Sequence, residues 1–224
     1  MDKIKIYISL FLIASLSACS NGGNSKKEIE KANESDTKST GAKKNILVFG
    51  DSLTAGLGLE TEEAFPALLG NKIDSLGLDY EVINGGLSGE TSAAGKARID
   101  WLLKDPVDVF VLELGANDGL RGIPVSETRK NLQSIIDQVK AKYPDVKMVM
   151  VGMEVPPNMG KSYSSEFRAI FPELAQQNKM ALVPFLLDRV GGVAELNQAD
   201  GIHPTAAGHK ILADNVWKVL KDIL

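Results

Sequence analysis

The pattern of apolar and polar positions divides the chain into a leader and a domain. Residues 6–18 form an apolar run interrupted only by serines, and a polar stretch rich in Ser, Asn, Gly, Lys, Glu and Thr extends from there to residue 44. From residue 45 onward, short apolar runs alternate with longer segments whose apolar residues recur at helical spacing. We therefore expect residues 45–224 to form the folded domain.

The alternation within this domain predicts an α/β fold. The short apolar runs predict strands at 46–49, 80–84, 107–114, 146–151 and 180–183. The segments with helical spacing predict helices at 62–76, 92–104, 126–142, 167–178 and 205–224. Strands that alternate with helices indicate a parallel sheet with helices on both faces. We expect Ser126 to cap its helix, and Pro172 to kink or break the helix that contains it.

Ser52 stands directly after the first predicted strand, in a turn bracketed by Gly50 and Gly56. Ligands of open parallel sheets bind at the carboxyl ends of the strands, so Ser52 is a candidate nucleophile. Glycine-containing loops at 85–89 and 115–119 follow the second and third predicted strands. Right-handed crossovers would bring both loops to the same sheet edge as Ser52.

A base for Ser52 must come from the two histidines of the chain. His209 lies within the last predicted helix with no carboxylate in phase, and we interpret it as a surface or satisfied residue. His203 precedes Pro204, which disfavours helical geometry, so its ring should project from a turn. Asp200 can accept the Nδ1–H of His203 while Nε2 takes the Ser52 proton. The alternative is that Asp200 and His203 only cap the last helix.

Acyl transfer also requires donors aimed at the developing oxyanion. Gly89 has no side chain, so its N–H can approach a ligand closely. The Asn117 amide is an uncharged donor, and the Ser52 N–H is a third. Taken singly, the loops around Gly89 and Asn117 are equally typical of ordinary turns. Their expected meeting at one sheet edge favours an oxyanion hole.

The first 44 residues predict export and a tether. Residues 1–18 combine a basic start with an apolar run that is too short for a mature transmembrane helix, as in a signal peptide. Leu16-Ser17-Ala18-Cys19 resembles the lipobox of bacterial lipoproteins, which implies a lipid anchor on Cys19 and a membrane-anchored protein facing the periplasm or the cell surface. An ordinary signal peptide with a chance cysteine is the alternative. Residues 19–44 have too few apolar side chains to fold and predict a flexible linker.

Composition narrows the chemistry of the domain. Cys19 is the only cysteine, so residues 45–224 have neither a disulfide framework nor a thiolate metal site. Residues 46–224 contain 17 Lys and Arg against 24 Asp and Glu, a net charge of −7. An acidic domain without a basic stripe argues against nucleic-acid binding.

Four blocks of the domain together resemble the SGNH (GDSL) hydrolases. They are Gly50-Asp51-Ser52-Leu53, Gly89, Gly115-x-Asn117-Asp118 and Asp200-x-x-His203. The likeness is strongest to the bacterial thioesterase I/lysophospholipase/arylesterase branch and covers residues 45–224. It implies a three-layer, flavodoxin-like α/β/α fold with a five-stranded parallel sheet. It also implies that Ser52, His203 and Asp200 are catalytic, that Gly89, Asn117 and the Ser52 amide form the oxyanion hole, and that no metal or organic cofactor is required.

The resemblance leads us to expect a serine esterase that acts on small acyl esters, thioesters or lysophospholipids. Leu120, Ile123 and the loop 155–160 are candidates for lining an acyl groove. A carbohydrate O-acetylesterase of the same fold is the main enzymatic alternative. A non-catalytic lipid- or glycan-binding module is another. A metal-dependent phosphoesterase would need to draw its ligands from Asp51, Asp118, Asp200 and His203.

Overall fold

The computed structural model describes residues 43–224. The predictions for residues 1–18, for Cys19 and for the linker up to residue 42 lie outside the described residues. The predicted linker ends slightly too late, because Lys44 already pairs with Tyr80 in the sheet. No helix within the described part of the chain is long and apolar enough to span a membrane.

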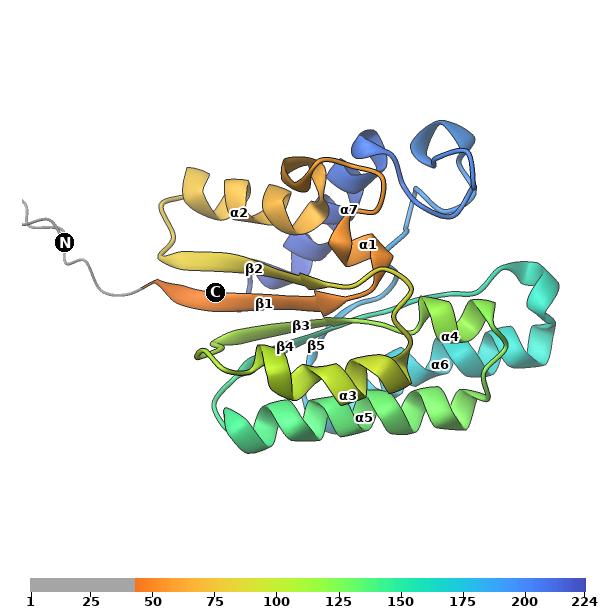
Figure 1. Ribbon diagram of the computed structural model, residues 1–224, viewed down its shortest axis with the longest axis horizontal. Helices are drawn as coiled ribbons and strands as arrows, with labels where there is room; N and C mark the ends of the chain where they lie inside the picture. Colours follow the sequence, from red (N-terminus) through yellow and green to blue (C-terminus); the bar gives the residue numbers. More distant parts are fainter. Residues whose placement is uncertain (1–42) are drawn as a thin grey trace, which may run out of the picture. The chain divides into compact units, whose positions relative to one another are not determined.

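The domain is a five-stranded parallel sheet between two layers of helices (Figure 1). The strands are β1 Lys44–Gly50, β2 Tyr80–Gly86, β3 Val109–Glu113, β4 Lys147–Val151 and β5 Ala181–Val183. Their order in the sheet is β2-β1-β3-β4-β5, and every neighbouring pair is parallel. The predicted fold class is confirmed.

Helices cover both faces of the sheet, as the alternation predicts. The longer ones are α2 Phe65–Ser75, α3 Ser92–Leu102, α5 Val125–Lys142, α6 Lys161–Asn178 and α7 Ala206–Leu220. Helices α2 and α7 pack together on one face, and α3, α5 and α6 cover the other (Figure 1). Two short helices, α1 Ser52–Ala55 and α4 Ala116–Leu120, follow β1 and β3. Three 3₁₀ turns complete the elements: η1 Thr61–Glu63, η2 Pro157–Met159 and η3 Ala194–Leu196.

The core lies on both faces of the central strands. Residues 46–49 of β1 and 109–112 of β3 are fully buried, which explains their uninterrupted apolar sequence. In the register of these strands, Gly50 at the end of β1 lies beside Glu113 at the end of β3. The sheet therefore ends in polar residues at the edge where α1 and α4 begin.

Several element boundaries differ from the predictions. Pro172 lies inside α6 and does not break it. The apolar face of this helix, which includes Phe167 and Phe171, is buried against the sheet and compensates for the missing backbone hydrogen bond. Ser126 is not an N-cap, because the helix already begins at Val125 after Pro124.

Three further differences concern other elements. The predicted helix 62–76 is divided at Ala64, where an extended residue separates η1 from α2. The predicted loop 115–119 is instead largely the helix α4. The last predicted helix, 205–224, ends early at Leu220, and Thr205 is its N-cap.

Candidate active site

Ser52 is the first residue of α1 and follows β1 after a single residue. Asp51 is the N-cap of this helix, and its side chain accepts a hydrogen bond from Leu53 N at 3.0 Å. A Cβ on Gly50 would lie 2.1 Å from Thr54 Oγ1, so only glycine fits under the turn. Gly56 ends the helix in the left-handed conformation, with φ of 76°. Glycine is therefore required at position 50 for steric reasons and at position 56 for its left-handed backbone conformation.

The structure brings Ser52, His203 and Asp200 into one hydrogen-bonded chain. His203 Nε2 lies 2.9 Å from Ser52 Oγ, and His203 Nδ1 lies 2.7 Å from Asp200 Oδ2. Residues 151 positions apart in sequence therefore meet at the predicted sheet edge. The capping alternative is wrong, because the N-cap of α7 is Thr205.

Asp200 is held ready as an ionised partner of His203. Its Oδ1 accepts hydrogen bonds from the backbone N–H groups of Ile202 and His203, each at 3.0 Å. The hydrogen bond from the His203 ring, followed by these two backbone bonds, lowers the pKa of Asp200 to about 2. Asp200 is nevertheless exposed to solvent, with 47% of its side-chain surface accessible. The carboxylate therefore owes its charge to hydrogen bonds and not to a dry environment.

A cavity of about 210 Å³ opens beside the Ser52 hydroxyl. Its lining residues are Ser52, Leu53, Leu57, Gly89, Asn117, Leu120, Ile202 and His203. All the predicted oxyanion-hole residues are in this set. A larger hollow of about 570 Å³ lies between α5 and α6 and includes none of them.

The reason for glycine at position 89 differs from the expected one. A Cβ at Gly89 would meet no atom within 4 Å, so there is open space for a side chain. The backbone has φ of +79°, a conformation that L residues rarely adopt. Glycine is therefore needed for the course of the loop.

The sequence model of the GDSL-like Lipase/Acylhydrolase family matches residues 48–211, a span that includes every residue of this site. The chain belongs to this family. Esterase TesA of Pseudomonas aeruginosa is 43% identical over 184 residues, which are 82% of this chain and 90% of that protein. The arylesterase of Vibrio mimicus is 40% identical over 180 residues, 80% of this chain and 89% of that protein.

Solved structures agree with this assignment. The crystal structure of TesA has a TM-score of 0.77 and 43% identity, and it matches 81% of this chain and 100% of its own. The psychrotrophic esterase EstA from Pseudoalteromonas, inhibited by monoethylphosphonate, has a TM-score of 0.75 and 33% identity, covering 80% of this chain and 97% of that one.

The residues that line the cavity of this GDSL hydrolase were only partly expected. Leu120 lines it as predicted, whereas Ile123 and the loop 155–160 are not among its lining residues. Leu57 and Ile202 were not singled out from the sequence. Both are more than 40% exposed and, with Leu120, give the cavity an apolar rim.

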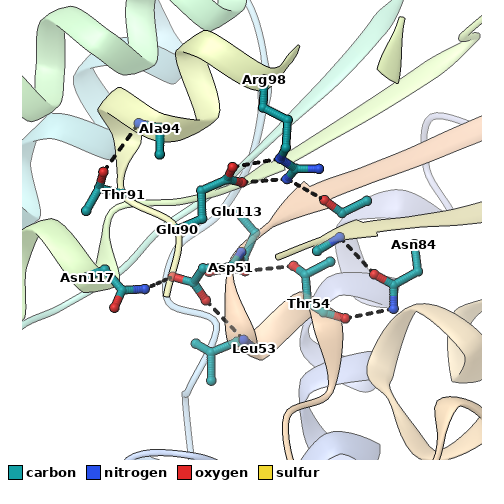
Figure 2. Close-up of polar contacts among 12 residues, drawn as sticks. Asp51, Leu53, Thr54, Asn84, Glu90, Thr91, Ala94, Arg98, Glu113 and Asn117 are labelled. Atoms are coloured by element: carbon teal, nitrogen blue, oxygen red, sulfur yellow. Dashed lines mark hydrogen bonds and ion pairs between the residues drawn. The ribbon is translucent and has the colours of Figure 1, made fainter. Parts of the chain in front are cut away.

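A buried carboxyl group beneath the nucleophile was also missed. Glu113 is fully buried at the end of β3, and its Oε2 accepts from Asp51 N at 3.2 Å and from Thr54 Oγ1 at 2.7 Å (Figure 2). Burial, reinforced by the charge of Asp51, raises the pKa of Glu113 well above its ordinary value. The signal available in the sequence was a single charged residue at the end of an otherwise apolar strand.

An ion pair between the buried Glu90 and the partly exposed Arg98 holds the loop that contains Gly89. Arg98 of α3 binds Glu90 through two hydrogen bonds of 2.6 and 2.5 Å, and it also donates to Gly85 O at 2.8 Å (Figure 2). The guanidinium lies 4.6 Å from the centre of the Phe49 ring. Because Glu90 directly follows Gly89, the ion pair with Arg98 anchors the Gly89 loop to α3.

The remaining polar candidates have structural roles. Asp118 is buried and accepts hydrogen bonds from Ser92 Oγ at 2.5 Å and from Thr128 Oγ1 at 3.3 Å. Asp118 is thus committed to α3 and α5, away from the metal site that the phosphoesterase hypothesis requires. Within residues 43–224, no three His, Cys, Asp or Glu side chains are grouped as metal ligands.

His209 is satisfied but not at the surface. It is 1% exposed, and its Nδ1 accepts a hydrogen bond from Phe65 N at 3.1 Å. This bond satisfies a donor at the start of α2. Burial lowers the pKa of His209 to about 4, so the ring stays neutral at neutral pH.

Proposed function

We propose that this protein is a serine esterase that cleaves carboxylic esters and thioesters through an acyl-enzyme on Ser52. The class of enzyme, a carboxylic ester hydrolase, follows from membership of the family. The observation that carries the mechanism is the hydrogen-bonded chain from Ser52 through His203 to Asp200 beside a cavity that also contains Gly89 and Asn117.

Each proposed role follows from the chemistry of the group. His203 accepts the Ser52 proton through Nε2 as the oxygen attacks the carbonyl carbon. Asp200, which is acceptor-only when ionised, keeps the proton on Nδ1 and stabilises the imidazolium that forms. The protonated His203 then passes its proton to the departing alcohol or thiol. A water molecule repeats the sequence on the acyl-enzyme and releases the acid.

The negative charge of the tetrahedral intermediate requires donors. The N–H groups of Ser52 and Gly89 and the Asn117 side-chain amide are the proposed donors, because all three residues line the cavity at Ser52. The apolar rim of Leu57, Leu120 and Ile202 is suited to acyl chains. We therefore propose aryl esters, acyl thioesters and lysophospholipids as the substrate class. Relatives named arylesterase and thioesterase 1/protease 1/lysophospholipase L1, the latter 37% identical over 80% of this chain, support this choice.

The experiment is hydrolysis of p-nitrophenyl acetate, butyrate and octanoate by the full-length protein, with EDTA present. Ser52→Ala should reduce kcat by roughly 10³-fold or more, because the nucleophile is lost. Ser126→Ala, an exposed serine of α5, is the matched control and should keep full activity. Full activity in Ser52→Ala would refute the mechanism. Turnover confined to acetate would favour the O-acetylesterase alternative, and no turnover of any ester would favour a binding module.

Export and lipid anchoring at Cys19 are a second, separate proposal. It is supported by the lipobox-like Leu16-Ser17-Ala18-Cys19 and by the absence of any other cysteine. Cys19→Ser should move the protein from the membrane fraction to the soluble fraction of the exported material. Continued sedimentation of this variant with membranes would contradict the anchor and leave the esterase proposal untouched.

A further inference from the structure

Asp51 lies directly behind the oxyanion site and touches one of its proposed donors. It is fully buried, and both carboxylate oxygens are engaged. Oδ1 accepts from Leu53 N at 3.0 Å, and Oδ2 accepts from Asn117 Nδ2 at 3.3 Å (Figure 2). Asp51 therefore connects the start of the nucleophile helix with the Asn117 amide.

The orientation of the Asn117 amide decides whether it can serve the reaction. Its nitrogen carries two hydrogens and can stabilise an oxyanion, whereas its oxygen is an acceptor and would repel one. An ionised carboxylate has no hydrogen to donate, so Asp51 can bind only the nitrogen. One N–H is then held by Asp51, and the other is free for substrate in the cavity that Asn117 lines.

We propose that ionised Asp51 is a positioning residue for ester hydrolysis, which keeps the nitrogen of the Asn117 amide, and not its oxygen, at the oxyanion site. This inference rests on the proposed function. Asp51 does not touch the reacting atoms and acts only through Asn117. Because of this contact, the effect of Asp51 on the orientation of the Asn117 amide depends on the charge of Asp51. A protonated Asp51 could donate a hydrogen bond and would favour the amide turned by half a rotation, with its oxygen toward Asp51.

The buried position of Asp51 and the charged groups around it set the pH at which its charge changes. Glu113 faces it from β3. Glu90 with its partner Arg98 faces it from the loop before α3, and His203 faces it from the loop before α7. Burial is the largest influence and Glu90 adds to it, while the hydrogen bonds from Leu53 and Asn117 and the charge of His203 act in the opposite direction. The result raises the pKa of Asp51 to about 6. Burial, followed by the charge of Asp51, raises the pKa of Glu113 well above its ordinary value.

Asp51→Asn tests the inference while preserving the helix cap, since Asn is as good an N-cap as Asp. With its oxygen on Leu53 N, the Asn side chain presents its own NH₂ group to Asn117 and permanently imitates the protonated state. Loss of one oxyanion donor typically lowers kcat by about 10²–10³-fold. We expect a decrease of roughly 10–100-fold in kcat for p-nitrophenyl butyrate, with KM changed less than about threefold, because substrate binding is not what the amide supports.

A double-mutant cycle with Asn117→Ala separates positioning from a general structural role. Once the amide is absent, Asp51→Asn should change kcat less than about threefold. Glu113→Gln is the matched carboxyl-to-amide control: Glu113 contacts the same turn through Asp51 N and Thr54 Oγ1 without touching Asn117, and the change should alter kcat less than threefold. The acid limb of the kcat/KM profile should be steeper in wild type than in Asp51→Asn, because Asp51 must lose a proton in the wild type and is absent from the variant.

The outcomes separate this inference from the proposed function. Wild-type activity that vanishes in Ser52→Ala must be present first; without it, the proposed function fails and the inference about Asp51, which rests on that function, is overturned with it. With it, the inference is overturned by unchanged kcat in Asp51→Asn, or by an equal loss in the presence and absence of the Asn117 amide. It is likewise overturned by an acid limb that is the same in both proteins.

Discussion

The buried charge of Asp51 should make the protein less stable at neutral pH than an isosteric neutral variant. Because the pKa of Asp51 is about 6 in the folded protein and 3.8 in its ordinary state, the native chain holds a proton that the unfolded chain releases between these values. Stability therefore falls as the pH rises through this window. Asp51→Asn removes this titration and leaves the N-cap and the shape of the side chain intact.

The size of this effect on stability follows from the difference between the two pKa values of Asp51, about 6 in the folded protein and 3.8 ordinarily. At about 1.36 kcal/mol per pKa unit, the titration of Asp51 lowers the free energy of unfolding by about 3 kcal/mol at pH 8 and by about 1 kcal/mol at pH 4.5. The free energy of unfolding of Asp51→Asn, minus that of wild type, should thus increase by about 2 kcal/mol from pH 4.5 to pH 8. In a domain of this size the increase is equivalent to roughly 4–8 °C in Tm.

Urea denaturation of both full-length proteins at the two pH values measures this difference. The subtraction cancels the titration of groups that are common to both proteins, provided the m-values agree. The hydrogen bond from Leu53 N to the ionised carboxylate is already included in the pKa of about 6, and the effect of replacing the protonated carboxyl group by an amide is the same at both pH values. A stability difference that does not change with pH would refute the reasoning, whatever its sign.

Three further changes test other parts of the site. Gly89→Ala should fold but lower kcat about tenfold or more, because φ of +79° is strained for alanine and the loop must shift its N–H; a normal kcat would show that this N–H is not used. Arg98→Met should lower the free energy of unfolding by about 3–5 kcal/mol in urea, since it leaves Glu90 buried and unpaired; Glu90→Gln in the same protein should restore part of the loss. His209→Gln should reduce the loss of stability between pH 7 and pH 4 by about 3 kcal/mol, because the unfolded chain takes up a proton near pH 6.5 that the buried ring refuses until about pH 4; equal acid sensitivity of both proteins would contradict this role.

The features that were predictable from the sequence are those with a local cause. Apolar runs and helical spacing identify the strands and main helices, and the handedness of the crossovers then assigns Ser52 and the glycine loops to one sheet edge. His203 was predictable as the partner of Ser52 because Pro204 shapes its turn and Asp200 lies three residues before it. Both hydrogen bonds of this chain are present in the structure.

The features that escaped prediction depend on contacts between distant segments. Glu113 lies beside Gly50 only because β1 and β3 pair in one particular register, and periodicity does not report which strands are neighbours. Pro172 lies inside α6 because packing outweighs the tendency of proline to break helices. The buried residues of α6 on both sides of Pro172 stabilise the helix. The helix α4 was read as a loop because its five residues include Asn, Asp and Gly, which are equally typical of turns.

The arrangement around Asp51 shows stability and activity making opposite demands on one residue. Asp51, Glu90 and Glu113 are all buried close to Ser52, and Arg98 is the basic side chain that binds into this group. Arg98 forms an ion pair with Glu90, whereas burial raises the pKa of Glu113 well above its ordinary value and raises that of Asp51 to about 6. Folding alone would favour a neutral residue at this position. The Asn117 amide, however, needs a partner that can only accept hydrogen bonds, such as an ionised carboxylate, if its nitrogen is to face the substrate. Asp51→Asn should therefore be both more stable and less active than wild type at pH 8. The activity difference should disappear when the Asn117 amide is removed, while the stability difference should remain.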